Sequence, residues 1–349
     1  MFFRPLCLSA LLALPLSWSI AQAQTTTFID DMGRDVAVQL PVERAVIFNR
    51  YGVEFARALR AMDRVVGIDQ STYRDPPYWP ELNADMIVGA GQAAPNYEAI
   101  VAARPDIVIL PRNGAWEEAA AQLEPFGIPV MVITAWDATK HVENVTLMGD
   151  LFDAPERAQA LNDFYTGYLT LLEERLAGVE PASIYIEETR PLVTVTPGSG
   201  WHDMALQGGA LNVFGSIDIA AEPASRGNVN AFTIDPEELV SRSPDLIFRL
   251  VPGAYESIPA DIYAAAWAEL STREEIRATP AWDAGNVHLV NYYLAGGASK
   301  ITGALQIAKW AHPDLFADID PEDAMRVWIE EFQGLPYQSG MTHRGQFQP

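Results

Sequence analysis

A single long helix between residues 153 and 178 constrains the fold of this chain more than any other stretch. Its apolar side chains recur with the period of an α-helix (Leu161, Tyr165, Tyr168, Leu172 and Leu176). Asp153 as N-cap with Glu156 three residues later forms a capping box, and Gly178 predicts the C-terminal end. At about 1.5 Å per residue this helix would be about 36 Å long. An ordinary connection within one α/β domain is shorter, so we interpret this helix as a rigid link between two lobes.

Strand-like and helical runs alternate on both sides of the long helix. The first side predicts a hairpin over 25–41 and buried strands over 44–49, 65–68, 106–110 and 129–133. The second side predicts strands over 182–187, 192–196, 245–248 and 287–290. Such alternation is typical of parallel sheets that are covered by helices. We therefore predict an α/β fold of two Rossmann-like lobes with mostly parallel sheets, joined by one long α-helix. The predicted divisions are an N-terminal lobe over 24–150, the connecting helix over 151–178, a C-terminal lobe over 179–337 and a tail over 338–349.

The first 23 residues have the pattern of a secretory signal peptide. Arg4 supplies the positive charge, residues 6–20 are apolar, and Ala21-Gln22-Ala23 is a small-residue cleavage site. An apolar run of this length is too short for a bilayer span, which needs about 20 residues. The one cysteine, Cys7, falls in this segment, so the mature chain would contain no disulfide and no thiolate ligand. We expect an exported periplasmic protein that does not insert into the membrane.

Charge narrows the possible partners. The formal net charge of −23 argues against binding to nucleic acid or to an anionic membrane surface. We expect a monomer with a small-molecule ligand.

Ligands of open α/β sheets bind beyond the carboxyl ends of the strands, which points here to residues 49–51, 70–79, 112–114 and 135–136. Guanidinium groups pair with carboxylate or catecholate oxygens, and aromatic rings offer flat faces. The candidate ligand contacts are therefore Arg50, Tyr73, Trp79, Arg112 and Trp136 in the first lobe, and Trp201, Arg226, Arg249, Tyr292 and Tyr293 in the second. One of the two adjacent tyrosines should face the ligand. Loop packing or a surface ion pair is the alternative explanation for each of these residues.

One segment occurs twice. Residues 96–109 and 232–248 each begin with a short helix that carries an acidic residue near its start and pass through Pro-Asp into an apolar strand. This repetition indicates that the two lobes are related. An acid at this position also interacts favourably with the helix dipole, which is an alternative reason for its presence.

Four segments, in this order, resemble the periplasmic binding proteins of ABC importers for iron–siderophore complexes, haem and cobalamin. They are RAVIFNRYGVEFARALRAMDRVVGID, VGAGQAAPNYEAIVAARPDIVIL, LEPFGIPVMVI and MGDLFDAPERAQAL. The resemblance covers nearly the whole mature chain. It implies two lobes that close slightly about a rigid helix, with the cargo between them and no permanently bound cofactor. It also implies that Glu98 and Glu237 pair with arginines of the permease.

Three of the candidate arginines, Arg112, Arg226 and Arg249, favour a ferric, siderophore-like chelate as cargo, and a corrinoid or haem is the alternative within the same class. An exported hydrolase is the alternative from another class, but no G-x-S-x-G motif is present. The five histidines show neither HxxxH nor HExxH spacing, so we predict no direct metal site. His202 remains a weak candidate for contributing to an iron centre that the cargo leaves open.

Overall fold

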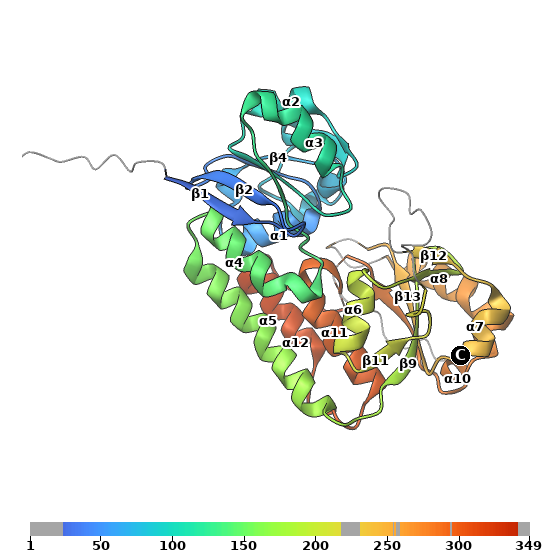
Figure 1. Ribbon diagram of the computed structural model, residues 1–349. Coiled ribbons are helices and arrows are strands. Elements are labelled where there is room, and N and C mark those ends of the chain that lie inside the picture. The colour runs from blue at the N-terminus through green and yellow to red at the C-terminus, as the bar shows by residue number, and fades with distance from the viewer. Residues whose placement is uncertain (1–23, 218–230, 254, 256–258, 294, 341–349) are drawn as a thin grey trace, which may run out of the picture.

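The computed structural model describes residues 24–217, 231–253, 255, 259–293 and 295–340 (Figure 1). The predicted signal peptide, Arg226 and the last part of the predicted tail lie outside these residues. The fold class is confirmed, because two α/β lobes are joined by one long helix. In Figure 1 the lower part of that helix, α5, runs beside helices of the second lobe, and the first lobe lies near the upper end of α5.

The first lobe is built on a four-stranded parallel sheet with an added hairpin. The sheet order is β4-β3-β7-β8, and all three neighbouring pairs are parallel. Almost every residue of these strands is buried, as expected for a sheet covered on both faces. The elements are β1 (Gln24–Ile29), β2 (Asp35–Leu40), β3 (Ala45–Ile47), α1 (Arg50–Ala58), β4 (Val65–Ile68), β5 (Gly89–Gly91), β6 (Ala94–Pro95), α2 (Tyr97–Ala103), β7 (Ile107–Leu110), α3 (Trp116–Leu123), β8 (Val130–Val132) and α4 (His141–Leu151).

The second lobe contains the same parallel arrangement and two additional antiparallel strands. Strands β11-β9-β13-β14 are parallel neighbours, and β10 pairs antiparallel with both β9 and β12. The elements are β9 (Ala182–Glu187), β10 (Val193–Val195), α6 (Gly200–Gln207), β11 (Ala210–Asn212), β12 (Ala231–Thr233), α7 (Pro236–Arg242), β13 (Leu246–Val251), α8 (Ala260–Thr272), α9 (Glu274–Arg277), α10 (Pro280–Asp283), β14 (Val287–Asn291), α11 (Lys300–Ala311), α12 (Pro321–Val327) and the π-helix η9 (Trp328–Phe332).

The repeated segment folds in the same way in both lobes. Helices α2 and α7 each have an Asx N-cap, in which Asn96 accepts from Ala99 N (3.1 Å) and Asp235 accepts from Glu237 N (2.8 Å). Both helices end in a non-glycine residue in the left-handed region, with φ of 48° at Arg104 and 47° at Ser243.

The Pro-Asp pair that follows each helix anchors the neighbouring strand. The Asp106 carboxylate accepts hydrogen bonds from Glu43 N and Arg44 N, at 2.8 Å each, immediately before β3. The Asp245 carboxylate accepts from Ser183 N (3.1 Å) and Ser183 Oγ (2.7 Å) in β9. The two lobes therefore share one local design as well as one strand order.

The connecting helix α5 spans Pro155–Leu176, which is close to the prediction. Gly178, with φ of +75°, follows its end as expected. The predicted capping box is wrong, because Ala154 occupies the N-cap position and makes no side-chain cap. Asp153 instead has φ of 52°, in the turn where Ala154 N returns to Gly149 O (2.8 Å), so the end of α4 determines where α5 begins.

Both hydrophobic cores include residues of the connecting helix. Ala158 and Leu161 pack in the core of the first lobe, whereas Leu172 packs in that of the second. The first core also contains side chains from the far end of the chain (Met325, Trp328, Ile329 and Phe332). After the second lobe, the chain therefore packs back against the first lobe and completes its hydrophobic core.

Candidate ligand-binding cleft

A cavity of about 250 Å³ lies where the carboxyl ends of the two parallel sheets meet. Its first-lobe wall comes from segments after β3, β4, β5, β7 and β8, and its second-lobe wall comes from segments after β9 and β14 and from the start of α6. The lining residues are Asn49, Arg50, Tyr51, Ser71, Gln92, Asn113, Trp136, Glu188, Ser199, Gly200, Trp201, Met204, Tyr292, Tyr293 and Gly297.

Five aromatic rings line this cleft. Tyr51 and Trp136 of the first lobe meet edge to face, with ring centroids 6.3 Å apart. In the second lobe the rings of Tyr292 and Tyr293 meet edge to face at 5.1 Å, and Trp201 lies 6.4 Å from Tyr292. Both adjacent tyrosines therefore line the cleft, where one was expected. Burial raises the pKa of Tyr51 and of Tyr292, so these phenols stay neutral hydrogen-bonding groups.

A row of side-chain amides crosses the first-lobe wall. Asn49 Nδ2 donates to Gln92 Oε1 (2.8 Å), and Gln92 Nε2 donates to Asn113 Oδ1 (2.8 Å). Asn49 has φ of 80°, and its backbone N donates to the buried carboxylate of Asp69 at 2.5 Å. These bonds hold the strand ends in register and leave polar groups at the cavity wall.

Among the described residues, Arg50 is the one candidate arginine that lines this cavity. Its Nε lies 3.3 Å from Glu54 Oε1, so its charge is balanced from within the same helix. The guanidinium also lies over the ring of Tyr293 from the other lobe, 4.7 Å from the centroid. Arg50 therefore links the two walls while facing the cleft.

Arg112 joins the two lobes but is not among the lining residues. It forms an ion pair with Asp137, and its Nη2 donates to the carbonyl of Gly198 in the second lobe at 2.6 Å. Its neighbour Asn113 takes the place at the cavity wall.

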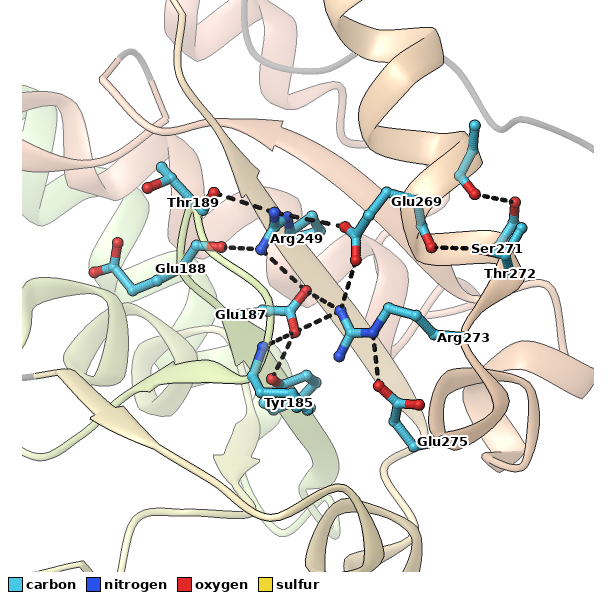
Figure 2. A network of polar contacts seen from close by, with 12 residues as sticks. Tyr185, Glu187, Glu188, Thr189, Arg249, Glu269, Ser271, Thr272, Arg273 and Glu275 are labelled. Atoms are coloured by element: carbon cyan, nitrogen blue, oxygen red, sulfur yellow. Dashed lines mark hydrogen bonds and ion pairs between the residues drawn. The ribbon is translucent and has the colours of Figure 1, made fainter.

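Arg249 lies inside β13 and forms part of a buried charge network (Figure 2). Its Nη1 lies 3.1 Å from Glu187 Oε2, and Arg273 Nη1 contacts both oxygens of that carboxylate, at 2.8 and 2.9 Å. Tyr185 Oη also donates to Glu187, at 2.9 Å. Glu187 is fully buried, and Arg249 is not among the residues that line the cavity.

The remaining candidates lie away from the cavity lining. Trp79 is 1 % exposed and packs in the first core under the guanidinium of Arg57, which is 4.1 Å from its ring centroid. Tyr73 is partly buried against the same core. His202 lies 3.4 Å from the Asn212 amide, and burial lowers its pKa.

The two glutamates predicted to contact the permease occupy equivalent places. Glu98 and Glu237 are both exposed and lie in the first turns of α2 and α7. Glu238 is instead paired with Arg242 at 2.6 Å.

Sequence reasoning missed several groups at the cavity, including Glu188, Gln92 and Asn113. Asn113 lies in a segment that the strand-end rule had already selected, but its uncharged amide was passed over for Arg112. Gln92 follows β5, a strand too short to show periodicity. Glu188 is the first residue after β9, so the same rule applied to the second lobe would have found it.

The lobes touch closely beside the cleft. Gly297 has φ of +63°, and a Cβ there would lie 2.0 Å from the Tyr51 ring; a Cβ on Gly200 would lie 2.7 Å from Trp136 O. Deeper in the seam, Lys300 Nζ of α11 donates to Ala135 O (2.8 Å) and lies 2.9 Å from Nδ1 of His141. Lys300 is fully buried, and this burial lowers its pKa to about 7.

Within the described residues, no group of three or more His, Cys, Asp or Glu side chains is arranged to hold a metal ion. None of the described helices combines the length and apolar character needed for a membrane span.

Residues 46–289 of the sequence match the family of the periplasmic binding proteins. The chain belongs to this family. Its members are solute-binding proteins, not enzymes, and they serve ABC importers of small ligands. Depending on the member, the ligand is a siderophore complex, haem, cobalamin or a metal species.

Curated relatives of this chain include vitamin B12-binding proteins. The one from Salmonella typhimurium is 28% identical over 168 residues, which is 48% of this chain and 62% of the relative. The one from Vibrio campbellii is 21% identical over 210 residues, or 60% of this chain and 70% of the relative.

Solved structures share the fold at low identity. The molybdate-bound periplasmic protein MolA of Haemophilus influenzae has a TM-score of 0.71 at 19% identity, covering 90% of this chain and 99% of that one. A haem-binding protein of Pseudomonas aeruginosa has a TM-score of 0.59 at 19% identity, covering 78% and 94%. These relatives carry different cargoes on one scaffold.

Proposed function

We propose that this chain is the exported, periplasmic solute-binding component of an ABC importer and that its cargo is a flat macrocyclic metal complex, with a corrinoid favoured over haem. The supporting observation is the cleft lining, in which five aromatic rings and a row of amides surround the cavity. Aromatic faces stack on a planar macrocycle, and amides exchange hydrogen bonds with the amide groups on a corrinoid's edge. The similarity to vitamin B12-binding proteins supports the same choice.

The state of the arginines weakens the case for a polyanionic chelate. Arg112 and Arg249 are engaged by Asp137 and Glu187, and displacing either one would strand a partly buried or buried carboxylate. Removing one partner of a buried ion pair costs about 3–5 kcal/mol. Among the described residues, a catecholate or citrate complex would therefore find one arginine at the cleft surface, Arg50.

A ferric siderophore-like chelate is the second candidate, and Arg50 is the observation that favours it. The Nη2 atom of Arg50 is buried without a hydrogen-bond partner, so this guanidinium keeps donor capacity beside the cavity. One carboxylate or catecholate oxygen could use it.

Cargo entry requires the lobes to separate. The cavity of about 250 Å³ is below the range of roughly 300–1,000 Å³ that is usual for ligand pockets. Contacts across the seam, such as Arg112 with Gly198 O, would break during entry, and the lobes would close around the cargo with a wider cleft than the one described here. We propose that the described arrangement is that of the protein without cargo.

We further propose that Glu98 and Glu237 dock the protein on its permease. They occupy matching first turns of the repeated segment, and both side chains are free to reach a partner's arginines. One such contact from each lobe would let the permease sense how far the lobes are apart.

Titration of tryptophan fluorescence tests the cargo, because Trp136 and Trp201 line the cleft. The panel is cyanocobalamin, haem, a ferric catecholate, a ferric hydroxamate and ferric citrate. We expect one-to-one binding of a macrocycle at about micromolar Kd, or about −8 kcal/mol. Trp136→Leu should weaken it at least about tenfold, whereas the control Trp267→Leu, remote on α8, should not. Binding of the ferric chelates alone would reject the macrocycle in favour of the second candidate.

Transport by the cognate importer tests the docking sites. The double variant Glu98→Ala/Glu237→Ala should bind cargo normally and lose most uptake. Glu118→Ala, an exposed acid on α3, is the matched control and should leave uptake unchanged. Normal uptake by the double variant would rule out docking through these two residues.

A further inference from the structure

The two walls of the cleft carry opposite charges. Arg50 lies on the first-lobe wall and Glu188 lies on the second-lobe wall of the same cavity. Arg50 is balanced by Glu54, whereas the Glu188 carboxylate forms no ion pair with a described residue. Burial raises the pKa of Glu188, and this effect outweighs the backbone hydrogen bond from Thr189 and the charges of Arg190 and Arg249, which lower it. The ionised carboxylate would therefore be stabilised further by a positive group in the cavity. Among the described lining residues of the second-lobe wall, Glu188 therefore supplies a net negative charge.

The backbone of Glu188 is held at both of its polar atoms. Its N–H donates to Val193 O at 2.7 Å, and its carbonyl accepts from Arg249 Nη1 at 2.6 Å (Figure 2). Arg249 Nη2 also donates to Thr189 O, at 3.1 Å. Two successive carbonyls after β9 are thus fixed by a single guanidinium, and the position of the Glu188 side chain at the cavity depends on it.

Arg249 is in turn fixed by the fully buried Glu187. That carboxylate accepts from Arg249, from Arg273, from Tyr185 Oη and from Leu192 N, the last at 2.7 Å. The same cluster includes Glu269, 3.7 Å from Arg249, and Glu275, 2.6 Å from Arg273. Two arginines and three glutamates leave this cluster with an excess negative charge, and within it the charge of Arg249 favours the ionised form of Glu188.

We infer that Glu188 is the specificity-determining residue of the cleft and that its carboxylate selects a cargo with positive charge at the metal centre or edge. Glu187 and Arg249 are positioning residues, because they fix the backbone that carries Glu188. This inference rests on the proposed function. Arg50 on the opposite wall would take an acceptor or anionic group of the same cargo. The cleft would then bind a polar complex in one orientation.

The test compares two corrinoids that differ by one charge at cobalt, cationic aquocobalamin and cyanocobalamin. The wild-type protein should bind aquocobalamin more tightly. Glu188→Gln keeps the size of the side chain and removes the charge, so the ratio of the two Kd values should fall about tenfold toward one. The affinity for cyanocobalamin should change less than about threefold. The control Glu98→Gln should keep the wild-type ratio.

Two further measurements separate recognition from simple loss of structure. As the pH is lowered, the affinity of the wild-type protein for aquocobalamin should fall as Glu188 becomes protonated, and it should do so at a higher pH than an ordinary glutamate would require. The Gln variant should not show this fall. Arg249→Lys keeps the positive charge but cannot bridge both carbonyls, so it should reduce the aquocobalamin preference while retaining cyanocobalamin binding. Haem, with its anionic propionates, should bind Glu188→Gln more tightly than wild type.

The outcomes are distinct. Equal affinity of the wild-type protein for the two corrinoids, or an unchanged ratio in Glu188→Gln, overturns the inference and leaves the proposed function standing. Failure of the wild-type protein to bind any macrocycle contradicts the proposed function itself. If haem alone binds and Glu188→Gln does not tighten it, the charge role of Glu188 is also rejected.

Discussion

The first lobe ends its strands in a row of neutral amides, Asn49, Gln92 and Asn113, whereas the second lobe surrounds its strand ends with a charge network around Glu187. Beneath these ends the lobes agree closely. Both have four parallel strands in the same order, and both anchor a strand start with the carboxylate of a Pro-Asp pair. The common part builds the scaffold, and the differing groups lie at or behind the strand ends that face the cleft. If the proposed function is correct, cargo preference is set at these strand ends.

The largest expected effect comes from breaking the charge network around Glu187, where two arginines share one buried carboxylate. Glu187→Ala leaves Arg249 and Arg273 buried without their main partner and should lower the free energy of unfolding by about 3–5 kcal/mol. Urea denaturation measures this loss. Glu237→Ala, exposed in the same lobe, is the control and should change stability by less than about 0.5 kcal/mol. A loss below about 1 kcal/mol would show that the network is not needed for folding.

The seam between the lobes should make stability depend on pH. Burial lowers the pKa of Lys300 to about 7, far below that of a lysine in the unfolded chain, and Asp137, Glu54 and Asp203 only partly oppose this. Above about pH 7 the unfolded state binds one proton more than the folded state, so this group makes stability rise with pH. The free energy of unfolding of wild type minus that of Lys300→Met should increase by about 1 kcal/mol per pH unit between about pH 7 and 9.

Lys300→Met is the reference because methionine has an apolar stem of similar length and no titratable group. The lost contacts with Ala135 and His141 therefore lower its stability by an amount that does not depend on pH. His141 has its pKa lowered by burial and by Lys300, and it is neutral over this range. A difference that does not vary with pH would mean that Lys300 stays protonated in the folded protein.

The two Pro-Asp anchors test how equivalent the lobes are. Asp106→Ala and Asp245→Ala each remove a carboxylate that accepts two hydrogen bonds, and each should cost about 1–3 kcal/mol. Asp106 is partly buried and Asp245 is exposed, so the first-lobe variant should lose more. Thermal unfolding followed by circular dichroism gives both values. A larger loss for Asp245→Ala would contradict the proposed equivalence.

The smallest effect is expected at the two helix caps. Asn96→Ala and Asp235→Ala each remove one N-cap bond and should cost about 0.5–2 kcal/mol, with nearly equal values. Asn96→Asp and Asp235→Asn keep a capping side chain and should remain close to wild type. Unequal losses at the caps would show that the lobes differ in their scaffold as well as in their strand ends.

Sequence was a good guide to the scaffold because periodicity and local motifs encode it. The connecting helix, the hairpin and the buried strands were all found near their observed bounds. The repeated segment also showed that the lobes were related. The error at Asp153 arose because the turn out of α4, a tertiary feature, decided which residue begins α5.

The site was harder to predict because charge partners are non-local. Arg249 was read as the end of a strand, but β13 continues to Val251 because Glu187 in the adjacent strand neutralises the arginine. Trp79 lies in the core because Arg57 covers its ring, and nothing near it in sequence indicates this. Short polar residues such as Asn113 line the cleft and carry no pattern that sequence reasoning could detect.

The return of Trp328 and Phe332 to the first core has a consequence for how the protein is made. A ribosome completes the first sheet early, but the side chains that seal its core are synthesised only after the strands of the second lobe. An N-terminal fragment would expose apolar surface from α1 and α5 and would be prone to aggregation. Nascent chains should therefore stay incompletely folded until Trp328 and Phe332 have been made, which would suit the export across a membrane that is proposed for this chain.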